Sequence, residues 1–165
     1  MGIQIRNHVI SITHPTKTTP EWSDHVERWY QLDAAAFAVA ESYWRLKDQF
    51  TRMPDLIIMG SFGASNLTDY HFAQSVLSGT PSAQKFVHSL PNVRSSSLCQ
   101  VMRWHGPLLC IQQDPNSFET AVSEARRLIK AGGPGNVWCI GVTHSEVYEK
   151  HQVLWTEVTE DGGKE

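Results

Sequence analysis

The feature that most constrains the fold is a short, unbroken apolar run, Leu56–Met59, which Asp55 precedes and Gly60 follows. A strand with one face in water alternates apolar and polar side chains, and this run does not alternate. Such a run is typical of a strand covered on both faces, as in a parallel sheet between two layers of helices. The sequence therefore predicts an α/β fold with a central strand at these positions.

Further strands and helices are predicted on both sides of this run, and their alternation indicates a largely parallel sheet. The connection between the last two strands is too short for a helical crossover, so we expect the last strand to run antiparallel. A single domain is expected over 1–160 and a disordered tail over 161–165. Strands are expected at 3–12, 55–60, 107–112, 136–143 and 152–159, and helices at 33–50, 68–77, 92–105 and 117–131, with a loop at 81–91.

The charge of the chain argues against nucleic acid and anionic membranes as partners. Its 165 residues carry 14 basic and 17 acidic side chains, for a formal net charge of −3 and a pI near 6.2. Binding to phosphate backbones usually requires a clearly basic face. No apolar run reaches the roughly 18–20 residues that span a bilayer, and the first residues have too little apolar length for a signal peptide. We therefore expect a cytoplasmic protein.

No residues show the spacing of a metal or cofactor site. The eight histidines form no H-E-x-x-H motif and no helical pair. Gly60 and Gly63 follow a strand, but they lack the third glycine of a dinucleotide fingerprint, so a tight turn is expected there. The three cysteines, Cys99, Cys110 and Cys139, contain no C-x-x-C pair and are expected to be reduced, buried thiols. We expect no metal ion and no cofactor.

From Asp55 to Val142, the order of features resembles the N-terminal half of a β-ketoacyl synthase, an enzyme of the thiolase fold. The segment IIMGSFG resembles a strand that ends in the family's glycine turn, and SLPNVRSSSLCQVMRWHGP resembles the segment before the nucleophile strand. IQQDPNSFETAVSEARRLIKAG resembles the nucleophile turn with its long helix, and VWCIGV the next core strand. The resemblance implies a three-layer half of a thiolase-like fold, with helices on both faces of a mixed five-stranded sheet of order 3-2-1-4-5 whose last strand is antiparallel.

The same resemblance implies that the family's chemistry is missing. Ketosynthases carry the acyl chain on a cysteine at the start of the helix after the Gly-Pro strand, and here that turn reads Gln113, Asp114, Pro115 and Asn116. The family's catalytic histidines come from the second half of the fold, which a chain of this length does not reach. Chain length factors resemble ketosynthases, lack the cysteine and pair with an active ketosynthase. We therefore expect a non-catalytic assembly or chain-length partner in polyketide or fatty-acid-like biosynthesis.

In this family, the strand before the nucleophile turn is an edge strand that pairs across the dimer, and it corresponds here to residues 107–112. We expect Leu108, Cys110 and Gln112 to lie beside such an interface, since an apolar edge left unpaired favours aggregation. The expected assembly is a homo-oligomer or a heterodimer with a ketosynthase. An acyl carrier protein is a further candidate partner.

Two other functions remain open. One is a small enzyme that reuses the fold for acyl transfer, with Cys110 or Cys99 as nucleophile and His88, His105 or His144 as base. Cys110 lies several residues before the family's nucleophile position, so this function requires a shifted register. The other is an oligomeric protein that binds an acyl or aromatic ligand where the family's tunnel would lie.

Overall fold

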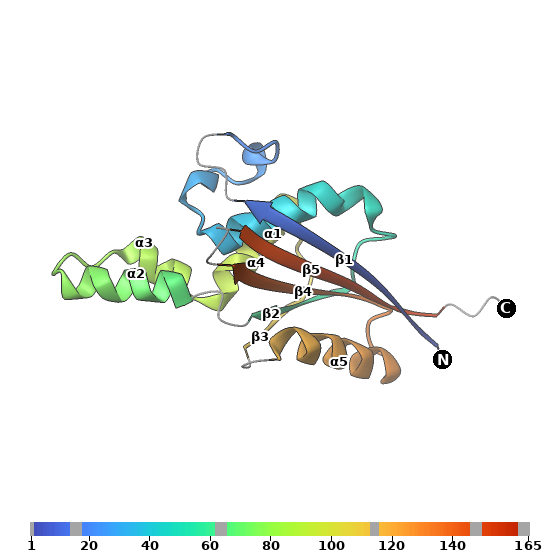
Figure 1. The fold of residues 1–165 in the computed structure, drawn as a ribbon. Coiled ribbons are helices and arrows are strands. Elements are labelled where there is room, and N and C mark those ends of the chain that lie inside the picture. Colours follow the sequence, from blue (N-terminus) through green and yellow to red (C-terminus); the bar gives the residue numbers. More distant parts are fainter. Residues whose placement is uncertain (1, 14–17, 62–65, 113–115, 146–149, 162–165) are drawn as a thin grey trace.

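A mixed sheet of five strands forms the middle of the computed structural model, which describes residues 2–13, 18–61, 66–112, 116–145 and 150–161 (Figure 1). The strands are β1 (Ile3–Thr13), β2 (Leu56–Ser61), β3 (Leu108–Ile111), β4 (Asn136–Ser145) and β5 (Lys150–Glu160). The helices are α1 (Ala34–Leu46), α2 (Asn66–Leu77), α3 (Ala83–Ser89), α4 (Pro91–Met102) and α5 (Ser117–Lys130). Short 3-10 turns occupy Ser23–His25, Trp29–Gln31 and Lys47–Gln49.

The strand order is β3-β2-β4-β5-β1. β2 runs parallel to β3 and β4, and β5 runs antiparallel to both of its neighbours, β4 and β1. This confirms the expected mixed sheet with an antiparallel fifth strand. The order 3-2-1-4-5 numbers the strands differently from the chain order used here. In chain order, β1 lies at the outer edge and pairs with β5 along all of its 11 residues. β1 suits an edge because its residues are mostly exposed, and Ile12 is the one that is fully buried.

The side chains of β2 alternate between two apolar clusters, one on each face of the sheet. Ile57 and Met59 pack with α1 and α4, and this group is called the α1/α4 cluster. Leu56 and Ile58 pack with α5, and this group is called the α5 cluster. All four side chains are buried. The structure therefore confirms the predicted strand that is covered on both faces, and β4 occupies the middle of the sheet.

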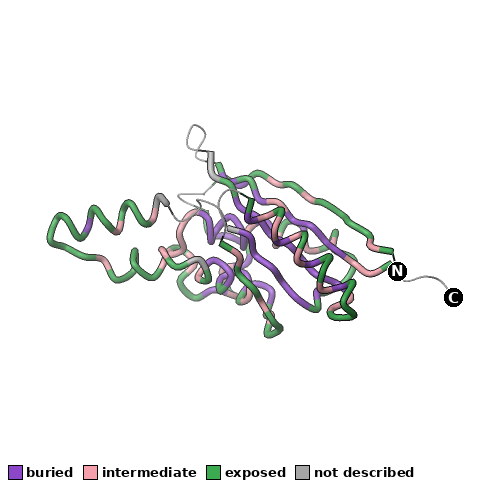
Figure 2. Tube along the Cα trace, turned by 90° about the horizontal axis from the view of Figure 1, so that it is seen from below, coloured by how far each residue is buried: buried purple, intermediate pink, exposed green. Residues whose placement is uncertain are grey.

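The prediction of a loop over 81–91 is wrong, because this segment contains α3. The hydroxyl of Ser82 accepts a hydrogen bond from the Lys85 N–H at 3.3 Å and so caps the helix. α2 and α3 form a hairpin that projects from one end of the sheet and is mostly exposed (Figures 1 and 2). A disordered tail is expected at 161–165. The N–H of Asp161 donates a hydrogen bond to the carbonyl of Gly2 at 2.8 Å, and residues 162–165 lie outside the described residues.

One buried carboxyl group on β5 contacts both β1 and the segment before β2. Glu157 on β5 is 2% exposed, and its Oε1 lies 3.3 Å from Nε2 of His8 on β1. Its Oε2 accepts hydrogen bonds from the hydroxyl of Thr51 at 2.9 Å and from the Thr51 N–H at 3.3 Å. A buried polar group of this kind stabilises a fold only while its partners are present.

We predict that Glu157→Gln lowers the free energy of unfolding by about 1–3 kcal/mol, because the amide nitrogen of Gln turns a donor toward donors that need an acceptor. Urea unfolding followed by circular dichroism measures this change. Glu160→Gln, on the same strand but less buried, is the matched control and is expected to change stability by less than about 0.5 kcal/mol. Equal stabilities for the two variants would contradict the assigned role of Glu157.

Candidate functional site

β3 lies at the edge of the sheet, where it pairs with β2 on one side and with no other strand of the described residues on the other. Leu108 packs against the α1/α4 cluster and Ile111 against the α5 cluster, which fixes the strand to the domain. Leu109 is 45% exposed, and Cys110 and Gln112 are also exposed. Of the residues predicted to lie beside an interface, Cys110 and Gln112 are therefore at the open surface and Leu108 is half-buried. Sequence reasoning missed Leu109, because strict alternation from Leu108 places it on the opposite face.

The open edge of β3 also offers backbone hydrogen-bonding groups. The N–H of Ile57 on β2 donates to the carbonyl of Pro107 at 3.2 Å. Every second residue of a strand bonds to the same neighbour in a parallel ladder, so Leu109 continues this ladder. The N–H and C=O groups of Leu108 and Cys110 then point to the open edge. Such an edge is a template for another strand.

The three cysteines lie in different environments. The Sγ atom of Cys110 is 3.2 Å from the hydroxyl oxygen of Ser95, a buried residue of α4. Burial raises the pKa of the half-buried Cys99 thiol, and the neighbouring Cys110 raises it further. Burial raises the pKa of the Cys139 thiol to about 12, as expected of an inert core thiol. The prediction that Cys110 is buried is wrong, because β3 is an edge strand.

We predict that iodoacetamide modifies Cys110 first, Cys99 more slowly and Cys139 only after unfolding. A raised pKa keeps a thiol protonated at neutral and mildly alkaline pH, and the thiolate is the reactive form. Mass spectrometry of tryptic peptides after short exposures measures the order. Labelling in urea, where all three cysteines should react alike, is the control, and early modification of Cys139 in the folded chain would contradict its burial.

Two glycines bring the first turn of α5 close to the sheet. Gly60 on β2 and Gly141 on β4 are neighbours in register. A Cβ atom at position 60 would overlap the backbone carbonyl of Ser117, and one at position 141 would lie 2.7 Å from the ring of Phe118. Gly60 is therefore needed for close packing of backbone on backbone. Gly63, the other glycine of the predicted turn, lies outside the described residues.

The predicted degenerate nucleophile turn stands at the start of the same helix. Gln113, Asp114 and Pro115 lie outside the described residues. Asn116 occupies the N-cap position of α5, and its side chain makes no capping hydrogen bond there. Its carbonyl accepts a hydrogen bond from the Thr120 N–H at 2.9 Å. Asn116 thus directly precedes the helix expected from residue 117, and its side chain does not cap that helix.

We predict that Gly60→Ala destabilises the fold by about 1–3 kcal/mol, because the added methyl group meets backbone that cannot rotate away. Gly141→Ala is the matched control on the neighbouring strand and should cost less, because it meets the edge of a side-chain ring. Phe118→Ala should relieve the effect of Gly141→Ala and leave that of Gly60→Ala unchanged. Thermal unfolding of the single and double variants tests this, and relief of both would contradict the backbone contact at Gly60.

Asp33 forms an ion pair with a buried arginine of α4 and also accepts a hydrogen bond from the start of α2. Arg94 in α4 is 1% exposed, and its Nε lies 4.0 Å from Oδ2 of Asp33. Oδ1 of Asp33 accepts from the Ala36 N–H at 2.6 Å, which confirms the predicted N-cap of α1. Oδ2 of Asp33 accepts from the hydroxyl of Thr68 in α2 at 3.4 Å. Burial lowers the pKa of the Arg94 guanidinium, and the Asp33 carboxylate counteracts this shift.

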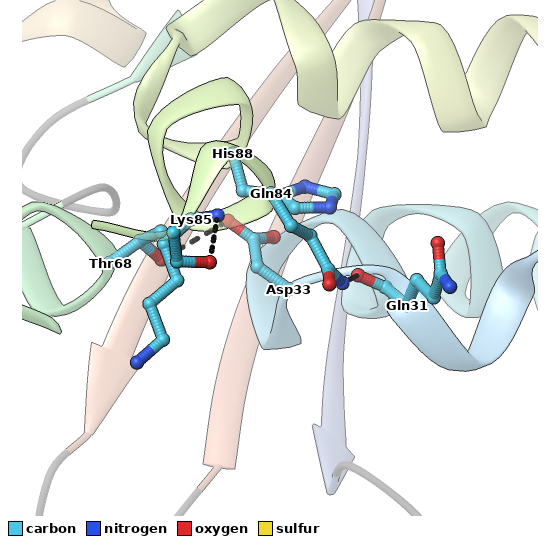
Figure 3. A pocket seen from close by; sticks show the side chains of 7 residues that line it. Gln31, Asp33, Thr68, Gln84, Lys85 and His88 are labelled. Carbon is cyan, nitrogen blue, oxygen red and sulfur yellow. Dashed lines mark hydrogen bonds between the residues drawn. The ribbon is translucent and has the colours of Figure 1, made fainter. Parts of the chain in front are cut away.

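A pocket of about 220 Å³ opens between Asp33 and α3 (Figure 3). Nε2 of Gln84 donates across it to the carbonyl of Gln31 at 3.2 Å, whereas the Lys85 side chain points away from Asp33. The pocket is smaller than the roughly 300–1,000 Å³ sites that hold drug-sized ligands, so it offers little room for an acyl chain. Its lining residues are Gln31, Asp33, Thr68, Ser82, Gln84, Lys85 and His88.

Of the three histidines predicted as candidate bases, the two whose side chains are described are not hydrogen-bonded to a cysteine of the described residues. His88 is half-buried in the pocket wall, and its Nδ1 atom has no hydrogen-bond partner. His105 is exposed in the connection between α4 and β3, and the side chain of His144 is not among those described. Within the described part of the chain, no hydrogen bond joins His88 or His105 to Cys110 or Cys99.

The residues that the structure describes contain neither a cluster suited to a metal ion nor a helix suited to a membrane. No group of three or more His, Cys, Asp or Glu side chains there is placed to hold a metal ion. No helix in those ranges combines the length and the apolar character needed to cross a bilayer. The open edge of β3 and the projecting hairpin are therefore the features that call for a functional explanation.

The fold is that of ketosynthase and chain length factor subunits. A chain of the complex between the ketosynthase ApeO and its chain length factor ApeC from Xenorhabdus doucetiae superposes with a TM-score of 0.71 and 15% identity, over 98% of this chain and 80% of that one. A chain of the ishigamide ketosynthase/chain length factor superposes with a TM-score of 0.67 and 12% identity, over 88% of this chain and 49% of that one. Neither a protein-family model nor a curated protein sequence matches this chain.

These similarities define a class of fold. The chain has the ketosynthase-like half of a thiolase fold that the sequence resemblance implied. It spans most of the matched chain in the ApeO/ApeC complex and about half of the matched ishigamide chain.

Proposed function

We propose that this chain is a non-catalytic subunit that pairs with an active ketosynthase through the open edge of β3, as an assembly or chain-length partner. The observation that carries the proposal is the exposure of Leu109 and Cys110 on an edge strand whose outer backbone groups have no neighbouring strand among the described residues. Soluble proteins normally protect such an edge. The two solved structures named above are ketosynthase/chain length factor assemblies, which supports the choice of partner.

The state of the cysteines supports a non-catalytic role. Decarboxylative condensation needs a thiolate nucleophile together with donors that stabilise the developing negative charge. Burial raises the pKa values of Cys99 and Cys139. Cys110 lies inside β3 and not at the first residues of a helix, where the family carries its nucleophile. The turn before α5 contains no cysteine in the sequence.

The size of the matched ApeO/ApeC chain also supports a partner role. Because the match spans 98% of this chain and 80% of that one, the matched chain is only somewhat longer. A subunit of nearly this size therefore occurs within a ketosynthase complex. By analogy, our proposal places this chain in polyketide or fatty-acid-like biosynthesis, with an acyl carrier protein as the further partner that brings the acyl chain.

Co-expression with ketosynthases encoded near this chain's gene, followed by size-exclusion chromatography, tests the proposal. Cys110→Pro removes an N–H group from the open edge and leaves the ladder to β2 intact, so we expect it to weaken the complex by about tenfold or more. Cys110→Ser keeps this N–H group, removes only the thiol and should bind like the wild-type chain. Leu109→Lys, which adds a charge to the edge, should also weaken binding, and circular dichroism reports whether each variant folds.

A wild-type chain that stays monomeric with every ketosynthase offered would contradict the proposal. An acyl-transfer activity of the chain alone that Cys110→Ser abolishes would instead establish the cysteine-dependent enzyme.

A further inference from the structure

The α2–α3 hairpin exposes an unusual amount of apolar surface. Monomeric soluble proteins rarely expose large contiguous apolar patches. Leu77 is 80% exposed, the highest value among the exposed large hydrophobic side chains of the described residues. Six of the eleven such side chains lie between residues 70 and 90: Tyr70, Val76, Leu77, Phe86, Val87 and Leu90.

α2 and α3 each carry exposed apolar residues on one helix face. Tyr70, Ala73 and Leu77 stand at i, i+3 and i+7 of α2, so they share one face of that helix, and all three are exposed. Ala83 and Val87 stand at i and i+4 of α3, and both are exposed. Each helix therefore presents an apolar stripe to solvent, as do helices that bind in a partner's groove.

Contacts within the hairpin hold these stripes in place. The rings of Phe72 on α2 and Phe86 on α3 pack with their centroids 5.3 Å apart. The hydroxyl of Ser75 accepts from the Ser82 N–H at 3.2 Å, and its carbonyl accepts from the Thr80 N–H at 3.0 Å. These contacts favour the same hairpin conformation in the unbound chain, which reduces the conformational entropy that the hairpin loses when a partner binds.

The hairpin carries almost no charge. Between residues 70 and 90, Lys85 is the single Asp, Glu, Lys or Arg, whereas such residues make up 19% of the whole chain. Depletion of charged residues is typical of the core of a protein–protein interface. The composition therefore fits an apolar protein surface as the occupant.

The position and area of the hairpin indicate which partner it meets. β3 has 4 residues and is about 13 Å long, far too short to bury the roughly 800 Å² per partner of a stable interface. α4 contacts both β3 and α3, so the open edge and the hairpin border the same helix. Figure 1 shows the hairpin extending beyond the end of the sheet, where it can reach along a partner that is seated on β3.

We propose that the apolar stripes of α2 and α3 dock into an apolar groove of the same ketosynthase subunit that pairs with β3. This inference rests on the proposed function and adds the element that supplies most of the interface area. β3 then sets the register of the two subunits, and the hairpin supplies the apolar burial.

The double variant Leu77→Asp/Val87→Asp tests this inference in the complex with the ketosynthase. It should weaken binding by about tenfold or more, because two exposed apolar anchors become charged. Val9→Asp is the matched control, since Val9 is 58% exposed on β1 at the opposite edge of the sheet. It should change affinity by less than about threefold. Hydrogen exchange of the wild-type chain, which needs no variant, should show increased protection over residues 70–90 in the complex.

The outcomes separate this inference from the function on which it rests. Binding that is lost in Cys110→Pro and retained in the hairpin variant, with unchanged exchange over 70–90, overturns the hairpin inference and leaves the proposed function standing. A wild-type chain that binds no ketosynthase overturns both. A homodimer of the wild-type chain that the hairpin variant dissociates overturns the assignment of the partner, because a second copy then occupies the hairpin.

Discussion

The burial of β2 on both faces is the constraint on which the rest of the structure depends. Its four apolar side chains alternate between the α1/α4 cluster and the α5 cluster, so helices must cover both sides of the sheet. Gly60 at the end of this strand lets α5 approach closely enough to do so. β3 pairs with the free side of β2 and has no second neighbour among the described residues, so it forms the open edge. The surface proposed to bind a partner is thus attached directly to the buried strand.

Sequence reasoning succeeded where the signal was local. The apolar run of β2, the N-cap at Asp33 and the short turn before β5 each depend on residues close together in the chain. It failed where no local pattern exists. The loop expected at 81–91 contains the helix α3, whose apolar residues face solvent and give no core-facing stripe. Arg94 was missed because its partner Asp33 is far away in the sequence.

Asp33 links three parts of the structure through one carboxylate. It caps α1, forms an ion pair with the buried Arg94 and accepts a hydrogen bond from Thr68 at the base of the hairpin. A buried charge that loses its partner is strongly destabilising, so loss of the Asp33 carboxylate would affect α1, α4 and the start of α2 together. A projecting hairpin binds a partner more tightly when contacts at its start restrict its motion, because ordering a loosely attached hairpin costs conformational entropy on binding.

The pairing of β1 with β5 has a consequence for how the chain folds during synthesis. Among the described residues, β1 pairs with β5 alone, the fifth strand in chain order, and Ile3 lies opposite Glu160. β1 therefore has no partner strand until β5 has been synthesised. Contacts between residues so far apart in sequence are slow to form, and exposed strands are prone to aggregate while they wait. The sheet therefore cannot be completed before β5 has been synthesised, and the backbone groups of β1 stay open to other strands until then.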